Sequence, residues 1–104
     1  MLTVRGHEMF ERILKELRER IRAGRFVVTL HAVEELEDEG LSVLDIEHVI
    51  LSGKITRRQK DADTGEWKYL VSGHTLSHDE VVVVAKLSPT DKLVIITIYG
   101  EAEQ

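Results

Sequence analysis

The fold is decided by the stretch Val81-Val82-Val83-Val84-Ala85 together with Leu93-Val94-Ile95-Ile96-Thr97-Ile98-Tyr99. β-Branched residues favour strands, and strands that are apolar at nearly every position need cover on both faces. The short turn between them contains Pro89, the only proline of the chain. We therefore predict that residues 81–87 and 93–99 are paired neighbours in the centre of a sheet.

The segment before this pair predicts a further hairpin. Its strands cover residues 54–60 and 67–72, and the polar turn between them carries Gly65. A second polar break follows at residues 73–78. The expected sheet is antiparallel and has three or four strands in the C-terminal half.

The first half of the chain has the pattern of helices. Apolar residues at steps of three and four form one stripe over residues 7–23, and Gly24 suits a helix end. A short strand is expected at residues 26–30, followed by a helix over residues 31–39. Ser42 and Asp45 resemble a capping box, which predicts a third helix that ends near residue 51. The predicted class is α+β, with N-terminal helices packed on one face of a twisted antiparallel sheet.

Length and composition limit the organisation. The 104 residues predict a single domain, 1–104, in which residues 1–25 form an N-terminal helix and residues 26–104 the core. The chain has no cysteine, which excludes disulfides and thiolate metal sites. It shows no apolar run typical of a signal peptide or a membrane span, so we expect a cytoplasmic location.

The charge is unevenly distributed. A net charge of −5 argues against a general nucleic-acid binder. However, residues 1–25 carry +3 and residues 54–78 carry +2, whereas residues 26–53 carry −7 and the remainder −3. If the two basic segments meet in space, they can form a local anion-binding face.

His31 is the first candidate for chemistry. It lies at a predicted strand-to-helix junction, and histidine titrates near neutral pH, so it can serve as a general acid or base. Alternatively, its ring bonds the backbone and fixes the junction. The sequence alone leaves both interpretations open.

Basic side chains follow the third predicted helix. Lys54, Arg57 and Arg58 can bind phosphate, or they can protect an edge strand from pairing with other chains. If Ile55 points to the core, strict alternation places Arg57 on the covered face and Arg58 in solvent. A covered arginine needs a partner, which makes Arg57 the better site candidate.

Residues with hydroxyl groups on the predicted strands are the remaining candidate site residues. Tyr69 and Tyr99 can stack on a base or donate a phenolic proton, although strand tyrosines are more often core rings with a hydrated hydroxyl. Alternation places Thr97 on one face with Ile95 and Tyr99, where its hydroxyl is expected to open on a pocket. We expect no metal site, because His74 and His78 fall in a predicted loop.

A series of residues along these predicted elements matches the pattern of a known family in order and spacing. They are His31-Ala32, Gly40, Ile46, Val49-Ile50, Gly53-Lys54-Ile55, Tyr69-Leu70, Gly73 and Ile96-Thr97-Ile98-Tyr99. In this order and spacing the chain resembles the domain of unknown function 4258 family, small prokaryotic proteins related in fold to the RelE and MqsR toxins. The resemblance covers roughly the last three quarters of the chain and makes residues 26–104 a RelE/MqsR-toxin-like core.

The resemblance implies a toxin-like, metal-independent endoribonuclease of a type II toxin–antitoxin pair, with RNA as substrate and no cofactor. It also implies a cognate antitoxin, often a small zinc-finger protein, and leaves a homodimer open. Such an enzyme needs a base, an acid and cations around the reacting phosphate. The candidate catalytic residues are His31, Arg57, Tyr69, Thr97 and Tyr99. The candidate phosphate-binding residues are Lys54 and Arg58.

The chain departs from the family pattern in its short acidic helix. Where the family usually carries two arginines, this chain has Glu35 and Glu39. Arginine suits bidentate phosphate contacts, whereas a carboxylate repels phosphate. Either the substrate face lies elsewhere, or this copy has lost activity. The second function class is therefore a non-catalytic binding module on the same fold, whose acidic helix docks a basic partner.

Overall fold

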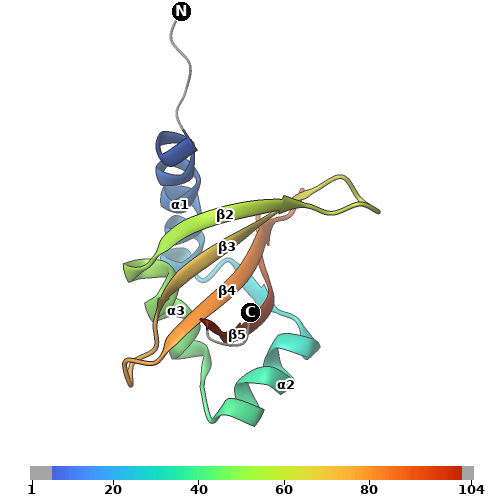
Figure 1. Ribbon diagram of the computed structural model, residues 1–104. Coiled ribbons are helices and arrows are strands. Elements are labelled where there is room, and N and C mark those ends of the chain that lie inside the picture. The colour runs from blue at the N-terminus through green and yellow to red at the C-terminus, as the bar shows by residue number, and fades with distance from the viewer. Residues whose placement is uncertain (1–5, 102–104) are drawn as a thin grey trace, which may run out of the picture.

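Three helices pack on one five-stranded sheet in the computed structural model, which describes residues 6–101 (Figure 1). The elements in chain order are α1 Gly6–Ala23, β1 Phe26–Val28, α2 Leu30–Glu39, α3 Val43–Ser52, β2 Lys54–Lys60, β3 Trp67–His74, β4 Glu80–Leu87 and β5 Leu93–Gly100. The predicted α+β class is confirmed, and the element ends lie within a few residues of their expected places.

The sheet has the strand order β1-β5-β4-β3-β2. β4 and β5 are central antiparallel neighbours, as predicted, with Val83 opposite Ile98. β1, however, pairs with β5 in parallel, and Val28 lies opposite Ile95. The four C-terminal strands are antiparallel, as predicted, but the whole sheet is mixed, because β1 adds a fifth, parallel strand that the sequence did not place in it. A tight turn forces antiparallel pairing only between consecutive strands, and β1 and β5 are separated by most of the chain.

The main core lies between the sheet and helices α1 and α3, which are behind the strands in Figure 1. The predicted stripe of α1 is confirmed, because Leu17 is fully buried and Leu14 and Ile21 nearly so. α3 contributes Ile46 and Ile50, which are also fully buried. Helix α2 packs mainly against β5.

The opposite side of the sheet carries a smaller apolar cluster. Its buried members are Leu70, Val82 and Val84, and Ile96 and Tyr99 pack against them. In the part of the chain that the structure describes, neither α1 nor α3 lies on this side (Figure 1). We call it the open face.

Two bulges interrupt the strand alternation. In β2 the register passes from Ile55 opposite Val71 to Arg57 opposite Leu70, so Thr56 is an extra residue. In β5 Ile96 is the extra residue, between two residues paired with Val84 and Ala85. One extra residue moves every later side chain of a strand to the other face. The bulges thus decide which candidate residues share the open face.

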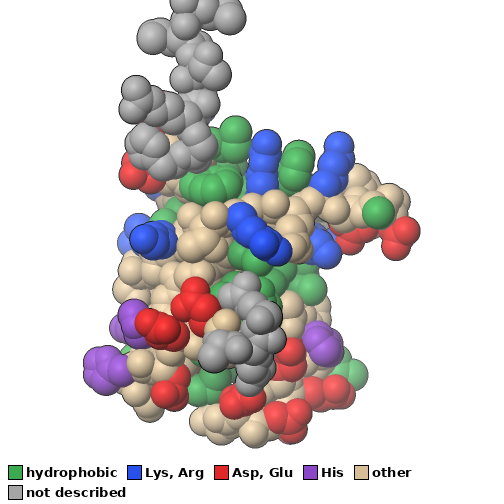
Figure 2. Space-filling model, viewed as in Figure 1, with side chains coloured by type: hydrophobic (Ala, Val, Ile, Leu, Met, Phe, Trp, Pro, Cys, Tyr) green, Lys and Arg blue, Asp and Glu red, His purple; other side chains and the backbone are tan. Residues whose placement is uncertain are grey.

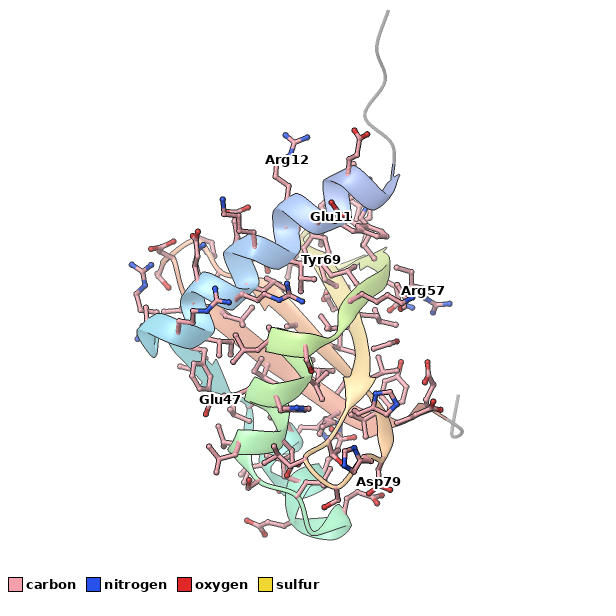
Figure 3. All side chains as sticks on the ribbon, turned by 90° about the vertical axis from the view of Figure 1, so that its left-hand side faces the viewer. Glu11, Arg12, Glu47, Arg57, Tyr69 and Asp79 are labelled. Atoms are coloured by element: carbon pink, nitrogen blue, oxygen red, sulfur yellow. The ribbon has the colours of Figure 1, made fainter. Side chains whose placement is uncertain are left out.

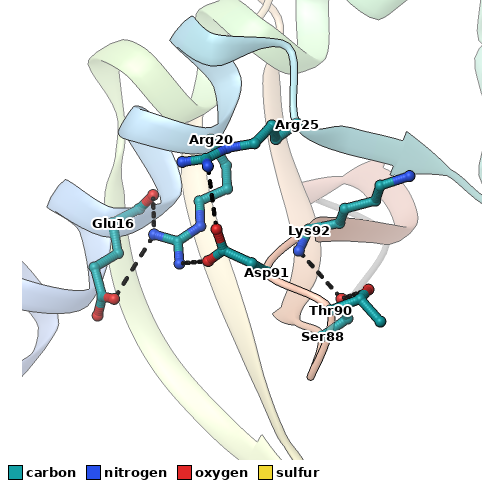
Figure 4. A network of polar contacts seen from close by, with 7 residues as sticks. All are labelled: Glu16, Arg20, Arg25, Ser88, Thr90, Asp91 and Lys92. Carbon is teal, nitrogen blue, oxygen red and sulfur yellow. Dashed lines mark hydrogen bonds and ion pairs between the residues drawn. The ribbon is translucent and has the colours of Figure 1, made fainter.

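A polar network joins the end of α1 to the turn between β4 and β5 (Figure 4). Arg20 donates to Asp91, and Arg25 Nη1 lies 3.1 Å from the other carboxylate oxygen of Asp91. Arg20 also pairs with Glu16 across one helical turn, at 3.7 Å. Asp91 has a positive φ of 66°, which aspartate tolerates better than most residues. The network fixes the turn that connects the two central strands.

Helix α3 is capped at both ends. The predicted capping box is confirmed: the Ser42 N–H donates to Asp45 Oδ2 at 2.9 Å, and the Ser42 side chain caps the helix in return. Its C-terminus has no basic residue of its own in the last turn. Arg18 of α1 supplies the cation instead, donating from Nε to Ile50 O and from Nη2 to Gly53 O, both at 2.9 Å.

Replacing Arg18 by alanine should lower the free energy of unfolding by about 2 kcal/mol. The change removes two charge-assisted hydrogen bonds and leaves two carbonyl groups at a helix C-terminus without their donor. Urea denaturation followed by circular dichroism measures the loss. Arg22→Ala, at an exposed position of the same helix, is the control and should change stability by less than about 0.5 kcal/mol. Equal effects of the two variants would contradict the capping role.

Candidate functional site

The candidate residues of the open face form two rows that cross four strands. One row is Lys54, Ser72, Val82 and Tyr99, and the next is Arg57, Leu70, Val84 and Thr97. Residues directly opposite on neighbouring strands have their side chains on the same face. Each row therefore begins with a basic residue on β2 and ends with a hydroxyl residue on β5.

The bulge at Thr56 corrects the sequence-based assignment of the two arginines. Arg57 points away from the helices, onto the open face (Figure 3). Arg58 is paired with Tyr69 and is therefore on the opposite face. The prediction that Arg57 is covered and Arg58 faces solvent is therefore wrong. Arg58 is half-buried, and its guanidinium carbon lies 3.9 Å from the ring centre of Trp67. Its observed contact is this stacking, on the side away from Lys54 and Arg57.

Tyr69 lies on the helix side of the sheet. It is 7% exposed and belongs to the main core, beneath α1 (Figure 3). The sheet separates it from Arg57 and Thr97. The structure thus gives Tyr69 the position of a core ring rather than a place beside the other candidates.

The bulge at Ile96 brings Thr97 and Tyr99 onto the open face. Alternation predicts that they share a face with Leu93 and Ile95, and this is wrong, because those two residues are fully buried in the main core on the helix side. Tyr99 instead packs against the small apolar cluster of the open face, opposite Val82.

His31 and Thr97 are connected through Glu35. The His31 Nε2 atom lies 3.5 Å from Glu35 Oε1, one turn further along α2. The same carboxylate oxygen accepts the Thr97 hydroxyl and the Ile98 N–H, the latter at 3.0 Å. The His31 side chain is 68% exposed and that of Glu35 only 26%. The arrangement presents an accessible imidazole, able to take up or release a proton, beside a carboxylate that is fixed to the sheet.

Thr29 rather than His31 fixes the strand-to-helix junction. Its hydroxyl accepts the Ala32 N–H at 3.1 Å and donates to Ile96 O at 2.9 Å, while its own N–H donates to Ile95 O at 3.0 Å. Thr29 is thus the N-cap of α2 and also extends the pairing of β1 with β5. The backbone role that the sequence left open for His31 is filled by its neighbour.

The position of Glu35 follows from the shortness of β1. Because β1 ends at Val28, opposite Ile95, no strand of residues 6–101 lies along the outer edge of β5 beyond that point. The Glu35 carboxylate takes the place of a strand there by accepting the Ile98 N–H. By residue type, Glu35 is a group that repels phosphate or part of an acidic helix that docks a basic partner, and neither interpretation predicts its contact with β5. Its four-residue spacing from His31 was the available signal for a contact.

The basic residues lie at the other edge of the open face. Arg57 and Thr97 are at opposite ends of one row, and three strand spacings separate their backbones by about 14 Å. Figure 2 shows Lys and Arg side chains gathered over the upper half of this view, and most Asp and Glu side chains over the lower half. The structure therefore does not bring Arg57 to His31. It offers an extended surface with cations at one edge and the imidazole at the other.

The turn between β2 and β3 adds a fixed negative charge. Asp61 Oδ1 accepts the N–H groups of Asp63 and Thr64 at 2.8 and 3.1 Å. These bonds lower the pKa of the Asp61 carboxyl below its usual value, because they favour the ionised form. The tip of the hairpin stays anionic, so the cations of β2 and not the tip would meet a phosphate.

Within residues 6–101, no three histidine, aspartate or glutamate side chains are grouped as a metal ion would need. The helices of this part of the chain also lack a span of the length and apolar character that crosses a membrane.

Comparison with family models gives one match, to the family described as Domain of unknown function (DUF4258), over residues 28–100. The match covers well over half of the chain, and the chain belongs to this family. It extends from the end of β1 to the end of β5, so helix α1 lies outside it. Neither the curated proteins nor the solved structures gave a match. The relation to the RelE and MqsR toxins stays a prediction.

Proposed function

We propose that this member of the DUF4258 family is a toxin-like, metal-independent endoribonuclease of the cytoplasm that binds single-stranded RNA across its open face. A cognate antitoxin is its proposed partner. The observation that carries the proposal is the pair of bulges, which sets Arg57, Thr97 and Tyr99 on the same side of the sheet as Lys54, opposite α1 and α3, with Thr97 linked to His31 through Glu35.

The chemistry of the open face suits a single strand better than a duplex. Bases of a single strand can lie on apolar and aromatic side chains while the backbone follows basic residues. Tyr99 offers a ring for stacking at one edge of the face, and Lys54 and Arg57 offer cations at the other. Because these cations are about 14 Å from Thr97, we propose that they bind phosphates that flank the reacting one.

His31 is the proposed proton-transfer group. In metal-independent cleavage the 2′-oxygen forms a bond to the adjacent phosphorus and the bond to the 5′-oxygen breaks, which yields a cyclic phosphate and a free 5′-hydroxyl. One proton leaves the 2′-hydroxyl and one is delivered to the departing oxygen. The exposed imidazole can carry out one of these transfers, and Glu35, held by Thr97 and Ile98, is the proposed positioning residue.

Arg57→Gln and Arg58→Gln form a matched pair that tests RNA binding. Both remove one charge from β2, but only Arg57 lies on the open face. With a fluorescent single-stranded RNA in EDTA, we expect Arg57→Gln to weaken binding about fivefold and to reduce the slope of log Kd against log salt by about 0.7. Arg58→Gln should leave both unchanged. Equal effects, or no RNA binding by the unaltered protein at low salt, would contradict the proposed face.

One observation favours the alternative, a non-catalytic binding module. The Glu35 carboxylate lies next to His31 and carries negative charge where a scissile phosphate would have to come. If the protein only binds, RNA stays intact in its presence while a basic partner still associates. Gel analysis of RNA incubated with the purified protein in EDTA separates the two functions.

A further inference from the structure

A small hollow lies at the end of the molecule away from the hairpin, where the end of α2 meets the ends of β4 and β5. Its volume is about 100 Å³. Its apolar lining residues include Leu41, Val81 and Ile98, and its acidic lining residues are Glu39, Asp79 and Glu80. Figure 3 shows Asp79 at this end of the molecule. We call this site the acidic hollow.

The negative charge around the acidic hollow favours binding of a cation. No lysine or arginine is among the described residues that line it, and the sequence has none from residue 26 to residue 53. The C-terminus of α2, at Glu39, adds the negative end of a helix dipole. Among the described contacts of these carboxylates, Glu80 Oε1 lies 3.7 Å from His74 Nε2. A single imidazole does not balance three carboxylates.

The volume decides what kind of cation fits. It exceeds the roughly 30 Å³ that one water occupies, and it is well below the roughly 300 Å³ at which small-molecule sites begin. One long side chain fits this range. An apolar lining with carboxylates around it matches a side chain with an aliphatic stem and a charged head.

We propose that the acidic hollow receives an arginine side chain from a basic segment of a partner polypeptide. Arginine is favoured over lysine because its planar guanidinium can bind a carboxylate with two hydrogen bonds. The inference deepens the partner part of the proposed function, since a basic antitoxin segment would supply the arginine. It does not depend on RNA cleavage.

Tyr99 lies at the border between the acidic hollow and the open face. It is among the lining residues of the hollow, but its ring packs against the small apolar cluster, on the other side of the sheet from Val81 and Ile98. The arginine site is therefore separate from the ring that we propose as a stacking surface for RNA.

The test uses an N-acetylated, C-amidated peptide of six arginines as the probe, with Kd measured by isothermal titration calorimetry at low salt. The double variant Glu39→Gln/Glu80→Gln should raise Kd about tenfold. The control double variant Glu34→Gln/Glu37→Gln removes the same charge from exposed positions of α2 outside the hollow, and should change Kd by less than about twofold. A six-lysine peptide should bind the unaltered protein more weakly than the six-arginine peptide.

Three outcomes would overturn the inference. They are equal losses in the two double variants, which would mean long-range attraction alone, equal binding of the two peptides, and no binding of the arginine peptide at all. Thermal melts of both double variants, which should match that of the unaltered protein, exclude unfolding as the cause. RNA cleavage is measured in a separate experiment. Absence of cleavage would contradict the proposed ribonuclease activity and would not affect the proposed arginine site in the acidic hollow.

Discussion

Replacing Glu35 by alanine should destabilise the protein by about 3 kcal/mol. The carboxylate is the acceptor for both the Thr97 hydroxyl and the Ile98 N–H, and among the described residues no strand lies beside β5 there to accept in its place. A donor that loses its partner in a poorly hydrated position costs about 1–3 kcal/mol. Two such donors depend on this single side chain, which is only 26% exposed.

Urea denaturation of Glu35→Ala beside Glu34→Ala measures this loss. Glu34 is the preceding, exposed residue of the same helix, so its replacement should change the free energy of unfolding by less than about 0.5 kcal/mol. Glu35→Gln keeps a carbonyl acceptor and should lose about 1 kcal/mol. If Glu35→Ala is as stable as Glu34→Ala, the carboxylate does not hold the edge of β5.

The same denaturation experiment also tests why this chain has Glu35 where the family pattern usually has an arginine. An arginine has no acceptor for the Thr97 hydroxyl or the Ile98 N–H. Glu35→Arg should therefore destabilise the protein at least as much as Glu35→Ala, and should not simply restore a phosphate-binding group. In this chain the glutamate at that position has a structural use that accounts for its presence without any reference to RNA.

Sequence periodicity was sufficient for the elements whose stability is local. The stripe of α1, the capping box at Ser42 and the pairing of β4 with β5 all follow from nearest-neighbour patterns, and all three are confirmed. The direction of β1 could not be predicted in this way. Its partner β5 lies at the other end of the chain, and no turn between them restricts how they pair.

The candidate site was harder to predict because the faces of its residues depend on two bulges of one residue each. Thr56 and Ile96 are ordinary strand residues by type, and nothing local marks them as bulges. A bulge is set by how two strands fit together, yet it reverses the face of every residue that follows. The faces predicted for Arg57 and Thr97 are therefore wrong, and both residues lie on the open face. The contacts of Arg18 with α3 were missed because they span more than thirty residues.

His31→Ala should lower the rate of RNA cleavage by about a hundredfold or more and leave the stability of the fold unchanged. A positioned acid or base contributes about this much to a rate. The side chain is 68% exposed, and its contact in the described structure is with Glu35, at 3.5 Å, so little packing is lost. Cleavage of a defined single-stranded RNA in EDTA, followed as a function of pH, measures the effect, and a thermal melt measures the stability.

His78→Asn provides the matched control. His78 is another exposed histidine, in the turn between β3 and β4, and its positive φ of 69° is one that asparagine tolerates. This variant should cleave RNA at the rate of the unaltered protein. If His31→Ala also cleaves at that rate, His31 carries no proton in the reaction. If the unaltered protein leaves RNA intact while the acidic hollow still binds the arginine peptide, the binding module is the better account of the fold. In that case the pairing of His31 with Glu35 belongs to the partner surface of α2.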